Sequence, residues 1–148
     1  MKKILGFIFL MLILVSATKY TADKEPTMHN IEGTWELQDF YQYDGQKIID
    51  TTPTAKGYRQ VKMYYNGKIM WSRTSPAEKT GRFGYGTYKI TPDRLLETIE
   101  YGDWEMIKAL DTIRQFSFEL ILKDDTYSQI NLDENGNRIF SENYKRID

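Results

Sequence analysis

The sequence has no cysteine and only one histidine among its 148 residues. The absence of cysteine excludes disulfide bonds and thiolate ligands for a metal. Zinc sites usually need more than one nitrogen or sulfur ligand, and His29 has no such partner nearby in the sequence. We therefore predict no metal site and no cofactor, and we expect the hydrophobic core to hold the fold together.

Net charge is also small, because 20 basic residues nearly balance 21 acidic ones. Proteins that bind nucleic acids normally carry a basic face. Proteins that bind the headgroups of a membrane surface carry clusters of lysine and arginine. The near balance of charge argues against both classes of partner, so we expect no nucleic-acid partner.

Apolar runs long enough for a membrane-spanning helix are absent, since a span needs about 20 residues. One shorter run, Ile4 to Val15, follows two lysines and precedes the small residues Ser16 and Ala17. This pattern is typical of a signal peptide. We predict a signal peptide over residues 1–17, cleaved after Ala17, which gives a secreted or periplasmic protein with no integral membrane domain. An uncleaved anchor is the alternative.

Aromatic residues make up 14% of the chain and include eleven tyrosines, a composition that favours β-strands. Residues 18–30 are polar and lack periodicity, so we expect a flexible leader. From Ile31 onward, strand-like runs alternate with short polar turns, which predicts antiparallel strands joined in sequence. We predict one domain over residues 31–148 with eight strands, at residues 31–43, 57–65, 68–74, 82–91, 94–101, 114–123, 126–133 and 137–147.

Two segments between these strands are interpreted differently. The longest link, residues 44–56, is predicted to be a loop or in part a short helix. In residues 103–112, three apolar residues recur at every third position after Asp103, which can cap a helix. This spacing predicts a short helix, and a strand is the alternative because apolar and polar residues also alternate there.

Turn residues predict the register of two hairpins. The stretch Tyr65-Asn66-Gly67 is interpreted as a three-residue loop, which pairs Tyr64 with Lys68. This pairing gathers four apolar side chains on one face: Val61, Met63, Ile69 and Trp71. The stretch Asp124-Asp125-Thr126 is interpreted as a loop of the same length. A slip of one residue would move each apolar set to the other face of the sheet.

Two further motifs are interpreted as structural. Gly81, Gly84 and Gly86 lie close together but continue into a strand and not a helix, which predicts a bent strand and not a phosphate-binding loop. Residues 133–137 are acidic but lack the order of ligands of an EF-hand, so we predict a turn and not a calcium site.

A meander of eight strands is stabilised by closing into a barrel, because closure removes both exposed edges. Gly33-Thr34-Trp35 resembles the G-x-W signature of the lipocalins and related calycins. In those folds an arginine of the last strand packs across the tryptophan, and Arg146 is the matching residue. The layout over about residues 30–148 is similar to small exported lipocalin-like domains of unknown function in Bacteroidetes. The chain departs from typical lipocalins in lacking their disulfide and a long helix after the last strand.

The resemblance implies an all-β, up-and-down, eight-stranded antiparallel barrel with Gly33, Trp35 and Arg146 at its floor. The predicted register also places Arg59 opposite Arg73 at the barrel mouth. There the two guanidinium groups could hold a carboxylate or phosphate; the alternative is that they face solvent or pair with carboxylates such as Glu97. We predict a cavity lined by Tyr41, Arg59, Met63, Trp71, Arg73, Tyr88 and Phe118. For the five of these that are aromatic or apolar, the alternative is a place in a plain hydrophobic core.

We predict a non-enzymatic binding module that holds a small hydrophobic or amphipathic ligand inside the barrel. The alternative is a filled barrel that binds a protein or glycan at the cell envelope through exposed tyrosines such as Tyr58 and Tyr64. No catalytic residue is predicted, because the sequence has no nucleophile motif and leaves only carboxylates and tyrosines for acid–base chemistry. The sequence leaves open the identity of the ligand, the presence of a cavity and the oligomeric state.

Overall fold

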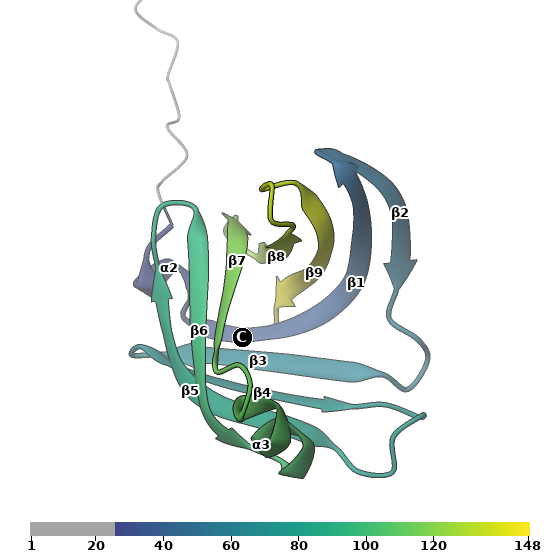
Figure 1. Ribbon diagram of the computed structural model, residues 1–148, viewed down its shortest axis with the longest axis vertical. Coiled ribbons are helices and arrows are strands. Elements are labelled where there is room, and N and C mark those ends of the chain that lie inside the picture. Colours follow the sequence, from purple (N-terminus) through teal and green to yellow (C-terminus); the bar gives the residue numbers. More distant parts are fainter. Residues whose placement is uncertain (1–25) are drawn as a thin grey trace, which may run out of the picture.

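The computed structural model describes residues 26–148, so the predicted signal peptide and most of the leader lie outside the described residues. Within this range, nine antiparallel strands form one sheet, accompanied by two short helices (Figure 1). The elements in chain order are α2 (Met28–Ile31), β1 (Gly33–Gly45), β2 (Lys47–Pro53), β3 (Arg59–Tyr65), β4 (Lys68–Thr74), β5 (Arg82–Ile90), β6 (Arg94–Gly102), α3 (Trp104–Leu110), β7 (Gln115–Leu122), β8 (Thr126–Leu132) and β9 (Arg138–Arg146).

The sheet closes on itself, because β1 pairs with β3 on one side and with β9 on the other. Eight strands, β1 and β3 to β9, therefore form a ring in chain order, and the predicted up-and-down antiparallel barrel is confirmed. No helix of residues 26–148 has the length and apolar character that crossing a membrane requires.

The ninth strand, β2, corrects the prediction of a loop over residues 44–56. Residues 47–53 pair with the second half of β1, where Asp44 faces Lys47 and Asp39 faces Pro53. Gly45 makes the tight turn with φ of +60°, which glycine adopts without strain. The isoleucines and threonines of this segment favour an extended chain. The segment forms a strand although all of its residues are exposed to solvent.

The two helices lie near opposite ends of β5 and β6 (Figure 1). The predicted helix after β6 is confirmed as α3, and the Asp103 side chain caps it by accepting hydrogen bonds from the backbone N–H groups of Glu105 and Met106. Helix α2 was not expected from the sequence. It places Ile31 in the core, fully buried, and it presents the Met28 carbonyl to the Tyr88 hydroxyl at 2.9 Å.

The register predicted for the β3–β4 hairpin is wrong by one residue. Tyr65 pairs with Lys68 and Tyr64 with Ile69, so the loop is the two-residue turn Asn66-Gly67. Both turn residues have positive φ, 46° and 73°, as a type I′ turn requires, and the twist of this turn matches that of the strands. As a result, Lys62 and Tyr64 face the interior, whereas Met63 is 51% exposed.

The β7–β8 hairpin shows the same correction. Leu122 pairs with Tyr127, which leaves a tighter turn than the predicted three-residue loop. The predicted alternation of β7 is confirmed, since Phe118 and Leu120 are buried. The new register turns Tyr127 and Gln129 of β8 into the barrel. In both hairpins, therefore, polar side chains occupy positions where the sequence alone predicted apolar ones.

The glycine-rich segment is a strand, as predicted, and not a phosphate-binding loop. The pairing of β5 with β6 contains a bulge, because Tyr85 faces Tyr101 while Gly86 faces Ile99, which leaves Glu100 of β6 as the extra residue. A Cβ atom on Gly86 would lie 1.9 Å from the Thr98 carbonyl oxygen. Gly84 lies against the indole of Trp71, where a Cβ atom would come within 2.5 Å of the indole nitrogen. Both glycines allow neighbouring groups to approach this part of the wall closely.

The floor of the barrel brings Gly33, Trp35 and Arg146 together. Trp35 is fully buried and its indole N–H donates to the Ile31 carbonyl at 2.7 Å. The Arg146 guanidinium lies 4.1 Å from the indole ring centroid and donates to the Glu32 carbonyl at 2.6 Å. Gly33 has φ of +135°, and a Cβ atom there would lie 2.1 Å from the guanidinium. The glycine therefore makes room for the arginine.

Candidate functional site

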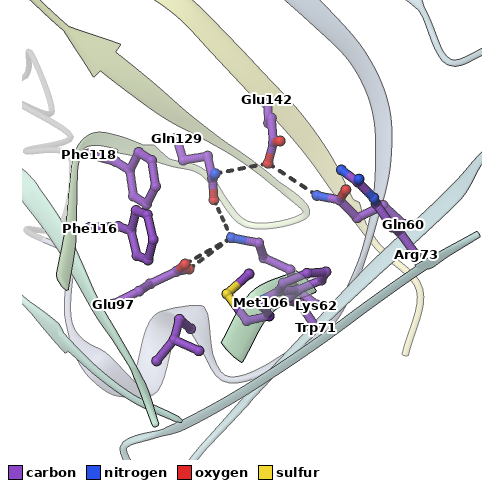
Figure 2. A pocket seen from close by; sticks show the side chains of 11 residues that line it. Gln60, Lys62, Trp71, Arg73, Glu97, Met106, Phe116, Phe118, Gln129 and Glu142 are labelled. Carbon is purple, nitrogen blue, oxygen red and sulfur yellow. Dashed lines mark hydrogen bonds and ion pairs between the residues drawn. The ribbon is translucent and has the colours of Figure 1, made fainter. Parts of the chain in front are cut away.

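A cavity of about 230 Å³ lies inside the barrel, beside α3 and partly open to solvent (Figure 2). It is formed by residues from β3, β4, β6, β7, β8, β9 and α3. The lining residues are Gln60, Lys62, Trp71, Arg73, Glu97, Ile99, Met106, Phe116, Phe118, Gln129 and Glu142.

Lys62 lies at the centre of the polar wall. Its ammonium group donates to both carboxylate oxygens of Glu97, at 2.9 and 3.1 Å, and to the side-chain oxygen of Gln129 at 2.7 Å. Lys62 and Glu97 are only 4% and 3% exposed. An ammonium group has three donors and no acceptor, so these bonds use all of the hydrogen-bonding capacity of Lys62. Within the described residues, the buried charge of Lys62 is therefore matched by Glu97 and its donors are satisfied.

Three tyrosines extend this network toward the floor. The Tyr64 hydroxyl donates to Glu97 at 2.5 Å and lies 3.3 Å from the Tyr127 hydroxyl, while the Tyr127 ring stacks on Tyr144 at 4.6 Å. Burial, followed by the negative charge of Glu97 or Glu142, raises the pKa of each of the three tyrosines well above 10. Their hydroxyls therefore remain protonated over the physiological range and act as neutral hydrogen-bond groups.

Glu142 differs from Glu97 because its partners are neutral. One oxygen, Oε2, accepts hydrogen bonds from Gln129 at 2.9 Å, Gln60 at 3.2 Å and Tyr144 at 2.5 Å. The Gln60 amide also donates to the Tyr144 hydroxyl at 2.6 Å. Within residues 26–148 no lysine or arginine forms an ion pair with Glu142. Its side chain is partly exposed and borders the cavity (Figure 2).

The apolar part of the lining lies in two groups on different sides of the cavity. Phe116 and Phe118 project from β7 on one side, and Trp71 and Met106 lie on the other (Figure 2). Trp71, Phe116 and Met106 are only partly buried, so their apolar surfaces remain accessible from the cavity. A site with aromatic side chains and a few fixed polar groups suits a small amphipathic molecule.

Two ion pairs hold the lining residue Arg73 and the start of helix α3. Arg73 donates to Glu78 at 2.6 Å, and Arg82 donates to Asp103 at 2.8 Å. Burial alone would raise the pKa of Asp103, but hydrogen bonds from the Phe83 N–H and from Arg82 outweigh it and lower this pKa below 3.8. The cap of α3 is therefore charged near neutral pH, and it anchors the helix that carries Met106.

The structure brings together only part of the predicted cavity set. Trp71, Arg73 and Phe118 line the cavity, whereas Tyr88 is buried nearer the floor against Tyr64, with 5.0 Å between ring centroids. Tyr41 borders a separate hollow beside β2 that shares no residue with the cavity.

The two remaining members of the predicted set point away from the barrel interior, because the predicted register was wrong. Met63 is exposed on the outer face, and Arg59 pairs with Glu36 at 2.5 Å on the surface. The predicted pairing of Arg59 with Arg73 is also wrong, since Arg73 lies opposite Gln60. Glu97, considered above as a partner of these arginines, is buried and pairs with Lys62 instead.

Sequence reasoning missed the polar groups Gln60, Lys62, Gln129 and Glu142. The signal that could have found two of them is the Asn66-Gly67 dipeptide, a strong marker of a two-residue type I′ turn. With a two-residue turn at Asn66-Gly67, the alternation of side chains along β3 places Lys62 and Gln60 on the inner face. Tyr64, predicted to be exposed, is fully buried, and Tyr58 is partly buried with its hydroxyl bonded to Gln60 at 2.7 Å.

Comparison with known proteins supports the fold assignment. No family model and no curated protein matches the sequence. A crystal structure of a lipocalin-like protein from Bacteroides uniformis matches with a TM-score of 0.56 and 10% identity, over 80% of this chain and 99% of that one. An uncharacterized protein from Bacteroides eggerthii matches with a TM-score of 0.51 and 13% identity, over 78% and 98%. The chain therefore has a lipocalin-like fold, as its G-x-W motif implied.

Proposed function

We propose that this protein is a non-enzymatic binding protein that holds a small amphipathic molecule in the barrel cavity. The cavity, which is lined by aromatic side chains together with fixed polar groups, is the observation that supports this function. Its volume of about 230 Å³ lies below the roughly 300–1,000 Å³ of sites for drug-sized ligands. The ligand is therefore small.

The hydrogen bonding of the polar wall favours binding over catalysis. A nucleophilic or basic lysine needs a free lone pair and access to the substrate, whereas every donor of Lys62 is engaged and the side chain is buried. Burial raises the pKa values of Tyr64 and Tyr127 next to it, so near neutral pH their hydroxyls stay protonated and offer no phenolate to act as a base.

We further propose that the protein works outside the cytoplasm. Two lysines, an apolar run of about a dozen residues and a small-residue segment ending at Ala17 support this localisation. Mass spectrometry of the protein from its native cells should give a mature chain that begins at Thr18. An intact N-terminus on an exported chain would favour the uncleaved anchor instead.

Native mass spectrometry of gently purified protein tests the binding function. We expect a co-purified small molecule in the wild type and its loss in Met106→Trp, since the larger side chain would fill the cavity. Met70→Trp is the matched control, because Met70 is exposed on the outer face of β4. Absence of bound molecules from the wild type, followed by no binding across panels of lipids, amines and aromatic acids, would contradict the proposal.

A second candidate, a surface for a protein partner, is favoured by one observation. Met63, Met70, Tyr85 and Tyr101 are consecutive cross-strand neighbours on β3 to β6. Three of them are about half exposed, and the two tyrosine rings lie 5.1 Å apart. Continuous apolar rows on a surface often mark interaction sites, and methionine side chains adapt to partner shape.

Site-specific photo-crosslinking would test this second function. A photoreactive residue at Met70 should capture one protein species of the cell envelope, and Met63→Ser should reduce the yield. The same residue at Ile139, which is exposed on β9, is the control and should not capture that species. Equal capture at both positions would argue against a specific surface.

A further inference from the structure

Three of the four charged side chains that line the cavity form ion pairs, and the fourth, Glu142, forms none among residues 26–148. Lys62 pairs with Glu97 at 2.9 Å, and Arg73 pairs with Glu78 at 2.6 Å. Each pair is formally neutral. Glu142 then remains as a carboxylate on the cavity wall with no cationic partner among residues 26–148. A carboxylate in a partly enclosed site gains more from an opposite charge than it would in water.

The hydrogen bonds of Glu142 also leave space for a ligand. The three donors described above all reach the same oxygen, Oε2. None of the hydrogen bonds among the described residues reaches Oε1. A carboxylate offers about four lone-pair positions, so a donor group from a ligand can add to the second oxygen without displacing Gln60, Gln129 or Tyr144.

The aromatic side chains favour the same charge. Trp71, Phe116 and Phe118 line the cavity together with Glu142 (Figure 2). The faces of aromatic rings attract cations, and Lys62 already shows this preference, with its ammonium 5.7 Å from the Phe118 ring centroid. Arg73 donates to Glu78 through Nη2 at 2.6 Å, while its buried Nε has no hydrogen-bond partner among the described residues. An anionic probe is therefore part of the test below.

We propose that the cavity binds a small organic ammonium ion, with the charged nitrogen at Glu142 and the apolar portion between Trp71 and the two phenylalanines. The inference rests on the proposed function, because it specifies the ligand of the same cavity. It excludes free fatty acids and other organic anions as preferred ligands.

The test uses three probes of similar size and different charge with the chain of residues 18–148: 2-phenylethylamine, 3-phenylpropan-1-ol and 3-phenylpropanoate. Dissociation constants come from isothermal titration calorimetry. The indole N–H resonances in NMR spectra locate the bound probe, because the three tryptophans lie in different places. Trp71 lines the cavity, Trp35 is at the floor and Trp104 is exposed on α3. We expect the amine to bind at least tenfold more tightly than the alcohol and to shift the Trp71 signal.

The variant Glu142→Gln keeps the shape of the side chain and the acceptor oxygen, and it should remove the preference for the amine over the alcohol. Glu100→Gln is the matched control, since Glu100 lies on the surface and pairs with Lys68 at 3.6 Å. Should Glu142→Gln fail to fold, the charge series and the loss of amine affinity at high salt in the wild type decide the question.

Equal binding of amine and alcohol, or tighter binding of the carboxylate, would overturn the ammonium inference and leave the binding function standing. Failure of all three probes to shift Trp71 would also overturn it, and native mass spectrometry would then decide the binding function separately.

Discussion

The guanidinium of Arg146 lies over the indole of Trp35, with 4.1 Å between the guanidinium carbon and the ring centroid. The two residues are also backbone partners, since Trp35 of β1 faces Arg146 of β9 in the register that closes the barrel. One contact therefore joins the first and last strands of the ring and covers the indole. The burial of Trp35 at the floor and the pairing of β1 with β9 therefore involve the same two residues.

Replacing Gly33 should reveal how tightly this contact is packed. Gly33→Ala places a methyl group against the guanidinium and imposes a positive φ on alanine, so we expect a loss of more than about 1 kcal/mol in unfolding free energy. Arg146→Ala removes the stacking and three hydrogen bonds from the guanidinium to backbone carbonyls, and it should cost about 2–3 kcal/mol. In urea titrations, the double variant should cost less than the sum, and simple additivity within about 0.5 kcal/mol would contradict this coupling.

The buried ion pair predicts an asymmetric response to mutation. Lys62→Met leaves the Glu97 carboxylate buried without its cation and should destabilise the fold by about 3–5 kcal/mol. The double variant Lys62→Met with Glu97→Gln leaves no unpaired charge and should recover part of that loss. Thermal and urea unfolding measure both effects.

The surface pair of Lys68 and Glu100 provides the control for this experiment. Both side chains are about half exposed and 3.6 Å apart, so Lys68→Met should change the unfolding free energy by less than about 1 kcal/mol. A double variant at Lys62 and Glu97 that is less stable than Lys62→Met alone would show that the pair contributes more than charge compensation.

Features that depend on neighbouring residues in the sequence could be predicted, whereas features that depend on contacts between distant residues could not. Strand positions, the cap at Asp103 and the barrel floor depend on local patterns, such as alternation and the G-x-W motif, and the structure contains each of them. Register depends on which face is buried. An apolar interior was assumed, and that assumption selected the three-residue loop before Lys68.

The interior is instead partly polar, and no pattern within a single strand indicates this. Lys62 is buried because Glu97, 35 positions away, and Gln129, 67 positions away, satisfy its donors. Such compensation requires the closed sheet and cannot be inferred from one strand. β2 was missed for a different reason, since an exposed strand on the outer edge has no alternating pattern of burial.

The buried tyrosines predict a loss of stability at alkaline pH. Burial and then the charge of Glu32 raise the pKa of Tyr88 from 10 to about 12 in the folded protein. A raised folded pKa stabilises the native state fully below pH 10, and this contribution is lost between pH 10 and about 12. Tyr64, Tyr127 and Tyr144 have pKa values raised in the same direction and should add to the decline above pH 10.

Urea titrations at a series of pH values measure this decline. The unfolding free energy should stay nearly level on the approach to pH 10 and fall beyond it, with tyrosinate absorbance rising as the protein unfolds. Tyr88→Phe should show a shallower fall between pH 10 and 12. An identical pH profile in that variant would mean that Tyr88 does not contribute to the transition.

Acid pH should act through the cap of α3. Hydrogen bonds from Phe83 and Arg82 hold the pKa of Asp103 below 3.8 despite burial, so its contribution to stability is present above pH 3.8 and is lost as the pH falls through the folded pKa. Asp103→Asn keeps a capping side chain but removes the charge that pairs with Arg82. It should be less stable than the wild type at pH 7 by about 1 kcal/mol.

The difference in unfolding free energy between wild type and Asp103→Asn should therefore shrink steadily as the pH drops below 3.8, because the wild-type side chain then becomes neutral too. Asp103→Ala removes the cap as well and should keep a deficit at every pH. Since α3 carries Met106 on the cavity wall, Asp103→Ala should also weaken binding of 2-phenylethylamine, while Asp103→Asn should weaken it less. A constant gap between wild type and Asp103→Asn from pH 7 to pH 2 would show that the charge of Asp103 does not support this helix.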